Sequence, residues 1–265
     1  MRLVVRELQR PRTGALRLFS ALANSLALGI AFFGMKGKRL DRPPYNPGVR
    51  DLVRGKQAWS TPLPADDLKQ GFLGWHEGGY LPHRDAPGLT QFVTFRLADA
   101  FPEALRLEWE ALLRIEDDRQ KRIQLETYLD RGRGTCHLRL QTIAEMIEAA
   151  LLFRNGVEYD LQAWVIMPNH VHLLFKVQSV PMSHLIDRWK GYTAKQANKL
   201  LGRQGSFWQA GYWDTYMRNS DHGLRARRYI ENNPVKAGLV RLANEWRSSS
   251  ARFRDAYGRL CLPAP

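Results

Sequence analysis

The segment 158–177 places the strongest constraint on the fold, because it contains two apolar runs separated by only two residues. The runs are EYDLQAWVIM (158–167) and HVHLLFKV (170–177), and Pro168 and Asn169 join them. Each run has the length of a strand and is apolar on both faces, as the central strands of a sheet are. A short connection of turn-forming residues favours an antiparallel hairpin. We therefore predict two neighbouring strands within a sheet.

The segments before this hairpin predict one more strand and two helices. QFVTFRL (91–97) alternates in side-chain polarity and is rich in β-branched and aromatic residues, which is typical of a strand. Region 101–155 is charged and favours helix, but DRGRGT (130–135) interrupts it. Since glycine breaks helical patterns, we expect one helix on each side of this interruption.

The segments after the hairpin complete the domain. A helix is predicted from Pro181 to about Leu201, GYWDTYMR (211–218) is a short strand, and Asp221 is expected to cap a helix that Pro234 ends. The order is strand, helices, strand, strand, helix, strand, helix. It predicts the α+β class: a ferredoxin-like antiparallel sheet with helices on one face, plus a C-terminal helix.

The N-terminal part of the chain differs in composition from this domain. Arginines precede the uncharged segment 18–35, a pattern that resembles a signal sequence or an anchor helix. An amphipathic extension and a leader upstream of a natural start at Met35 are the alternatives. We predict an N-terminal extension and linker over residues 1–70, a compact domain over 71–250 and a C-terminal tail over 251–265.

The net charge narrows the class of partner. Lys and Arg total 40 against 26 for Asp and Glu, so the formal charge is +14. Such an excess favours a polyanionic partner, with nucleic acid as the first expectation and a membrane surface as the second. Cys136 and Cys261 form neither a disulfide framework nor a paired-thiol metal site. We expect a cytoplasmic protein associated with the nucleoid, rather than one anchored by segment 18–35.

The second strand of the hairpin carries a candidate metal site. Side chains alternate along a strand, so His170 and His172 lie on one face and Val171 and Leu173 on the other. Two imidazoles on one face can share an ion, although a single histidine on a strand is more often an ordinary core residue. The sequence contains no HExxH motif and no nearby cysteine pair, so a third ligand must come from another segment.

The last helix offers that ligand and a nucleophile. Arg225, Tyr229 and Asn233 are spaced by four residues and therefore lie on one helix face. A surface helix with an incidental tyrosine has the same spacing. If the helix packs beside the histidines, however, a tyrosine hydroxyl lies next to a cation that polarises a phosphate diester, which is the chemistry of a DNA nickase.

At these motifs the chain resembles a known family. AWVIMPNHVHLLF resembles the histidine-hydrophobe-histidine motif of the HUH endonucleases, and FWQAGYWDTYMRNSDHGLRARRYIENNPVKAGLV resembles the tyrosine segment of their single-tyrosine, IS200-like transposases. Within that family the chain is most similar to the REP-associated tyrosine transposases, which GYLPHRDAPGLTQFVTFRLAD (79–99) also fits. The resemblance covers about 71–250.

The resemblance implies roles for the matching residues. His170 and His172 would hold a divalent ion, Mg²⁺ or Mn²⁺, with Asn233 as the third ligand, where many relatives carry glutamine. Tyr229 would attack the scissile phosphate and form a 5′-phosphotyrosine link. The substrate would be single-stranded or hairpin DNA of the repetitive extragenic palindrome (REP) type. No nucleotide cofactor is implied, and a monomer and a homodimer are both compatible with the sequence.

DNA contacts are expected from arginines and lysines. A basic stripe lies on the helix after Pro181, and Arg225 adds a charge beside Tyr229; the stripe comprises Arg188, Lys195, Lys199 and Arg203. A solvated helix face is the structural alternative. For the whole chain we expect a metal-dependent DNA endonuclease and strand transferase. The alternatives are a catalytically idle DNA-binding regulator with the same fold, and a hydrolase that uses metal-activated water.

Overall fold

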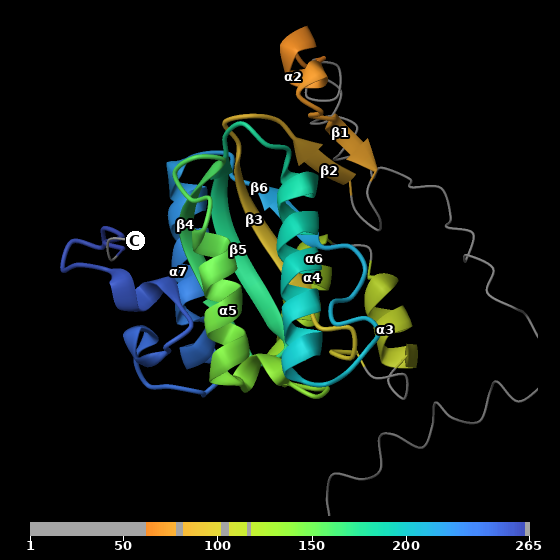
Figure 1. The fold of residues 1–265 in the computed structure, drawn as a ribbon, viewed down its shortest axis with the longest axis vertical. Helices are drawn as coiled ribbons and strands as arrows, with labels where there is room; N and C mark the ends of the chain where they lie inside the picture. The colour runs from red at the N-terminus through yellow and green to blue at the C-terminus, as the bar shows by residue number, and fades with distance from the viewer. Residues whose placement is uncertain (1–61, 78–81, 102–105, 116–117, 263–265) are drawn as a thin grey trace, which may run out of the picture. The chain divides into compact units, whose positions relative to one another are not determined.

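The computed structural model describes residues 62–77, 82–101, 106–115 and 118–262 (Figure 1). Segment 18–35, for which an anchor or leader was considered, lies outside these ranges. Within the described residues, no helix has both the length and the apolar composition needed to cross a bilayer.

A four-stranded antiparallel sheet forms the centre of the domain. Its strands are β3 (Thr90–Arg96), β4 (Tyr159–Ile166), β5 (His170–Val177) and β6 (Trp213–Tyr216), in the order β4-β5-β3-β6. The predicted hairpin is present as β4 and β5, which pair from Tyr159↔Val177 to Ile166↔Val171. β5 lies between β4 and β3, as expected of a strand that is apolar on both faces, but β4, for which the same position was expected, lies at the edge of this sheet.

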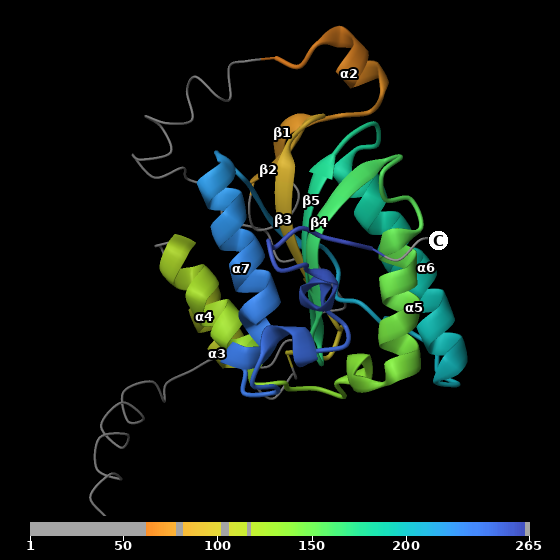
Figure 2. The same ribbon diagram turned by 90° about the vertical axis from the view of Figure 1, so that its left-hand side faces the viewer.

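Helices cover both faces of this sheet. α5 (Gln141–Leu152) and α6 (Met182–Leu200) lie on one face, whereas α7 (Ser220–Lys236) lies on the other, as Figures 1 and 2 show. With the strand order, this arrangement confirms the predicted ferredoxin-like sheet with its additional C-terminal helix.

Side-chain alternation on β5 separates two apolar clusters. Val171, Leu173 and Phe175 belong to the larger cluster, which includes apolar residues of α5 and α6. Leu174 points to the other face and packs in a smaller cluster with Ala226 and Ile230 of α7. Because successive side chains of a strand point to opposite faces, β5 holds both helical layers against the sheet.

Aromatic residues fix the layer of α5 and α6. Tyr159 of β4 is fully buried, and its hydroxyl donates a hydrogen bond to the Leu151 carbonyl of α5 at 2.6 Å. Its ring meets Trp189 of α6 edge-on, with centroids 5.0 Å apart. One side chain therefore contacts both helices of this layer.

The region between β3 and α5 contains more helix than predicted. α4 (Asp118–Asp130) precedes the glycine-containing break, as expected, but a separate helix, α3 (Arg106–Leu113), comes before it. The break requires glycine at one position: Gly134 has φ +86°, and a Cβ there would lie 2.5 Å from the Asp99 carbonyl oxygen. A residue with a side chain does not fit at this position.

Several small elements surround the domain, and the sequence patterns did not predict them. They are α2 (Ala65–Lys69), the antiparallel pair β1 (Gly74–Glu77) and β2 (Pro82–Asp85), and the 3-10 turns η2 (His137–Arg139), η3 (Ala243–Glu245) and η4 (Ser250–Phe253). After η4 the chain returns to the sheet: Arg254 donates to the Gln162 carbonyl of β4 and, at 2.7 Å, to Glu231 of α7. The proposed domain boundaries at 70 and 250 remain predictions.

The ends of α7 correct two expectations. The N-cap is Asn219, whose side-chain oxygen accepts from the His222 amide at 2.8 Å, whereas Asp221 lies within the first turn. Pro234 does not end the helix, which continues to Lys236. A proline near the C-terminus removes only its own backbone donor, and the Ala237 amide still donates to the Asn233 carbonyl at 2.9 Å.

Substitutions at Asn219 and Asp221 should show which of the two residues caps α7. Loss of an N-cap side chain typically costs about 1 kcal/mol of stability, so we expect Asn219→Ala to lower the free energy of unfolding by about that amount. Asp221→Ala should cost less than about 0.5 kcal/mol, because the exposed carboxylate interacts only with the helix dipole. Urea denaturation of both variants measures the two effects. An equal loss in both would show that Asn219 is not the principal cap.

Candidate active site

Two histidines of β5 meet on the α7 face of the sheet. His170 and His172 are both fully buried, and their Nε2 atoms lie 3.1 Å apart. The rings are steeply inclined to each other, with centroids 4.6 Å apart. The alternation predicted from the sequence therefore brings two imidazole nitrogens to one point.

The opposite nitrogen of each ring has its own partner. His170 Nδ1 lies 2.8 Å from the side-chain oxygen of Asn169, whose amide nitrogen donates to the Arg133 carbonyl at 3.0 Å. His172 Nδ1 lies 2.7 Å from the Thr94 hydroxyl, and Thr94 is its cross-strand neighbour on β3. Such partners fix the orientation of metal-binding histidines and their tautomers.

Burial keeps His170 neutral. Desolvation, together with the charges of Lys236 and Arg96, lowers the pKa of His170 to about 3. Since its Nδ1 proton is directed to the acceptor Asn169, Nε2 carries a lone pair. This nitrogen is available either to a proton on His172 Nε2 or to a cation.

α7 places a phenol and an amide beside this pair. The Tyr229 ring lies 5.7 Å from the His172 ring and 6.0 Å from Phe92, measured between centroids. Asn233, one turn further along α7, donates from its amide nitrogen to the Tyr229 hydroxyl at 3.2 Å. The helical spacing therefore brings the two polar groups into direct contact.

Asn233 has an unsatisfied oxygen. The residue is fully buried, and its Oδ1 atom has no hydrogen-bond partner. An orphaned buried carbonyl costs about 1–3 kcal/mol, so it needs a compensating ligand. An amide oxygen and two imidazole nitrogens are donor types that a divalent cation can take.

A lysine and an aspartate adjoin the tyrosine. Lys236 Nζ lies 5.5 Å from the centre of the Tyr229 ring and forms an ion pair with Asp130 Oδ2 at 2.9 Å. Asp130 is the last residue of α4, and burial raises its pKa while the contact with Lys236 opposes the shift. The ion pair therefore connects α4 to the helix that carries Tyr229.

A comparison with known families covers the residues of this site. Residues 138–233 match the family described as Transposase IS200 like, and this segment contains both histidines, Tyr229 and Asn233. Residues 138–233 are thus similar to the IS200-like transposase family. The match confirms the resemblance drawn from the two sequence motifs.

Curated proteins similar to this chain include REP-associated ones. The REP-associated tyrosine transposase of Escherichia coli K12 is 27% identical over 108 residues, which cover 40% of this chain and 64% of the relative. A relative from Haemophilus influenzae is 25% identical over 103 residues, 35% of this chain and 58% of its own length. The chain thus spans less than two thirds of these curated relatives. A solved REP-associated tyrosine transposase bound to a REP hairpin superposes with a TM-score of 0.43 at 18% identity, covering 71% of this chain and 93% of that one.

Metal-ligand clusters of the commonest kind are missing from the described part of the chain. It contains no group of three or more His, Cys, Asp or Glu side chains that could hold a metal ion. The role of Asn233 as a third ligand remains a prediction.

The predicted DNA-binding residues lie in two places. Arg188, Lys195 and Lys199 of the basic stripe are on α6, which covers the face of the sheet opposite the histidines, whereas Arg203 follows the end of this helix (Figure 2). Arg188 in this stripe pairs with Glu158, and Arg203 donates to the Ser206 carbonyl at 3.2 Å, whereas Lys195 and Lys199 are exposed. Arg225 is exposed on α7, the helix that carries Tyr229. The fold does not bring the stripe to the candidate active site.

Two other tyrosines, on the segment before α7, lie apart from the candidate site. Tyr212 and Tyr216 lie at β6, away from the amide of Asn233, and burial with nearby carboxylates raises the pKa of Tyr212. His83 is buried against Asp214 and Tyr212. Asp214 pairs in register with Val93, whose side chain belongs to the α5 and α6 face. His83 therefore lies away from the histidine pair.

Thr94 supports His172 without being part of the motif, and its removal should weaken metal binding. We expect Thr94→Val to lower Mn²⁺ affinity about 10-fold or more, because partners behind a ligand commonly contribute 10- to 100-fold. Isothermal titration of the purified chain with Mn²⁺ measures the change. Thr215→Val, a matched substitution on the neighbouring strand β6, is the control. An unchanged affinity in the Thr94 variant would remove His172 from the ligand set.

Proposed function

We propose that this chain is a metal-dependent single-stranded DNA endonuclease and strand transferase that acts on REP-type hairpins through Tyr229. The observation that carries the proposal is the contact of Tyr229 with Asn233, because the unpartnered oxygen of Asn233 would complete a donor set with the two histidines. The names of the relatives support the choice of REP-type DNA as substrate.

His170, His172 and Asn233 would hold the cation, for which Mg²⁺ and Mn²⁺ are the candidates. When bound, it would polarise the scissile phosphate and bring it to the tyrosine. Burial of the two imidazoles keeps His170 unprotonated at neutral pH, so that protons do not compete for its Nε2 atom.

Tyr229 performs the bond exchange. Its oxygen attacks the phosphorus, the bond from phosphorus to the 3′-oxygen breaks, and the leaving oxygen takes a proton to become a 3′-hydroxyl. The phenolic proton passes to solvent. The product is a 5′-phosphotyrosine, which keeps the diester bond energy, so a later 3′-hydroxyl can reverse the step without a nucleotide cofactor.

The nucleophile can be tested separately from binding. Tyr229→Phe should bind a labelled REP-type hairpin with a single-stranded flank nearly as well as the unaltered chain, but lose both nicking and the covalent adduct. Tyr212→Phe and Tyr216→Phe should keep the adduct. Denaturing gels detect the adduct, and mass spectrometry should locate the nucleotide on the peptide RRYIENNPVK.

The same experiment distinguishes the alternative functions. Cutting by Tyr229→Phe without an adduct would indicate a hydrolase that uses activated water. An unaltered chain that binds the hairpin but never forms an adduct in Mn²⁺ would be an idle DNA-binding regulator. An adduct on Tyr212 or Tyr216 would overturn the assignment of the nucleophile.

Lys236 is proposed as a positioning residue for Tyr229. Its ammonium lies over the phenol ring, where a positive charge favours the deprotonated, phenolate form of the attacking oxygen. About half of the lysine side chain is exposed, so solvent screens the effect. Asp130 holds the ammonium in place from α4.

We expect Lys236→Met to slow single-turnover adduct formation several-fold while changing the hairpin Kd less than twofold. Lys236→Arg should restore most of the rate because it keeps the charge, and Asp130→Asn should lie between the two. Lys69→Met, which removes an exposed lysine of α2 paired with Asp66, is the control. Equal rates in Lys236→Met and the unaltered chain would contradict the role.

A further inference from the structure

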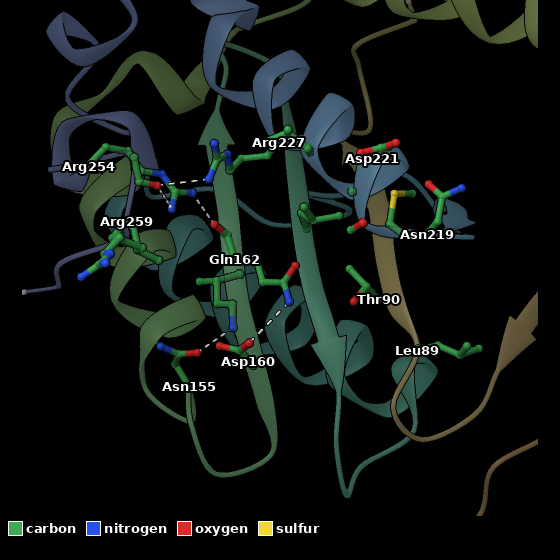
Figure 3. Close-up of a pocket in the computed structure, with 18 of the residues that line it drawn as sticks. Leu89, Thr90, Asn155, Asp160, Gln162, Asn219, Asp221, Arg227, Arg254 and Arg259 are labelled. Atoms are coloured by element: carbon green, nitrogen blue, oxygen red, sulfur yellow. Dashed lines mark hydrogen bonds between the residues drawn. The ribbon is translucent and has the colours of Figure 1, made fainter. Parts of the chain in front are cut away.

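A groove lies beside the candidate active site, on the α7 face of the sheet. It has a volume of about 1050 Å³. Strands β3, β4 and β5 form its floor, and the N-terminal half of α7 and the segment around Arg254 and Arg259 form its sides (Figure 3). This part of the sheet is covered by neither α5 nor α6, which lie on the opposite face.

The groove carries an excess of positive charge. Its lining includes four arginines and two aspartates; these are Arg218, Arg227, Arg254, Arg259, Asp160 and Asp221. Arg254 is held by Glu231 and by the Gln162 carbonyl, so it supports the wall. Arg227 donates to the Gly258 carbonyl at 3.1 Å, but its Nε atom is buried and has no partner. Arg218 and Arg259 are exposed at the rim, where they can reach an anion.

Apolar and aromatic groups accompany these charges. The lining contains Leu89, Leu174, Met217, Leu224, Leu260 and Leu262. Tyr257 stands at the rim with 87% of its surface exposed, and the Arg259 guanidinium lies 5.9 Å from the centre of its ring. Arginines that track phosphates next to an aromatic face that stacks on bases are the combination found in single-strand binding grooves.

The floor of the groove continues to the histidine pair. Leu174 lines the groove, and the next residue of β5 on the same face is His172. On β3, Thr90 lines the groove, and Phe92 and Thr94 follow on the same face toward the Thr94–His172 contact. Since same-face residues of a strand are about 7 Å apart, the groove begins within one or two such steps of the site.

We propose that this groove binds the unpaired DNA strand next to the scissile phosphate. Arg218 and Arg259 contact its phosphates, and Tyr257 stacks on one of its bases. The inference rests on the proposed function, since it concerns the same substrate. It also assigns strand binding to the α7 face and to the segment after η4, rather than to the basic stripe of α6.

Binding of a dT15 oligonucleotide to the full chain tests the groove. By fluorescence anisotropy, Tyr257→Ala with Arg259→Gln should raise the Kd about 10-fold, within the range of one lost stack and one lost phosphate contact. Arg218→Gln with Arg259→Gln should reduce the slope of log Kd against log salt by about 1.4, or about 0.7 per contact.

A matched surface pair provides the control. Phe153 is 77% exposed at the end of α5, and the Arg154 guanidinium lies 5.0 Å from the centre of its ring. Phe153→Ala with Arg154→Gln removes the same kinds of group from the opposite layer and should leave the Kd unchanged. Equal Kd values for the control and groove variants would overturn the proposal.

Photo-crosslinking identifies the contact directly. A dT15 oligonucleotide with one 5-iododeoxyuridine should crosslink to the peptide that contains Tyr257, and crosslinks confined to α6 would place the strand on the other face. Adduct formation on a hairpin is measured in parallel. If the groove variants lose dT15 binding but the unaltered chain forms no adduct, the proposed function is refuted and the groove is not. If the unaltered chain forms the adduct but the groove variants bind dT15 as tightly as it does, the groove is refuted and the proposed function is not.

Discussion

The burial of two imidazoles on the central strand is the constraint on which the rest of the structure depends. His170 and His172 occupy positions that would otherwise hold apolar side chains, so every polar atom of the two rings needs a partner inside the protein. Asn169 and Thr94 are the hydrogen-bond partners of the Nδ1 atoms, and the two Nε2 atoms lie next to each other. The packing of α7 over this pair excludes water and brings Tyr229 and Asn233 to the same point.

The two faces of the sheet differ in the kind of side chain that they carry. The layer of α5 and α6 buries the odd-numbered residues of β5 and provides most of the apolar core. α7 covers a smaller apolar cluster and leaves part of its face to polar groups and to the groove. The larger apolar layer thus holds the strand in place, while the polar groups of the candidate site lie on the other face, where hydrogen bonds to Asn169 and Thr94 compensate for the burial of the imidazoles.

Residues far apart in the sequence complete the site. Thr94 lies 78 positions before His172, and Asp130 lies 106 positions before Lys236. Neither residue has a spacing that would identify it, since threonine on a strand and aspartate at the end of a helix are common. Their roles arise from strand register in the first case and from the approach of α4 to α7 in the second. Local patterns also misplaced the N-cap of α7, because both Asn219 and Asp221 are good capping residues and only the backbone geometry distinguishes them.

The sequence by itself determined the elements whose signal is periodic: the hairpin of β4 and β5, the shared face of the two histidines and the i, i+4 spacing of Tyr229 and Asn233. Period 2 in strands and 3.6 in helices are local properties, so they can be recognised without a fold. Only the tertiary structure decided that α7 packs on the histidine face, that the basic stripe of α6 lies on the opposite face, and that the segment after η4 closes a groove. These features depend on contacts between segments that are distant in the sequence. The free energy of packing decides which of these contacts form, and local sequence patterns contain no information about them.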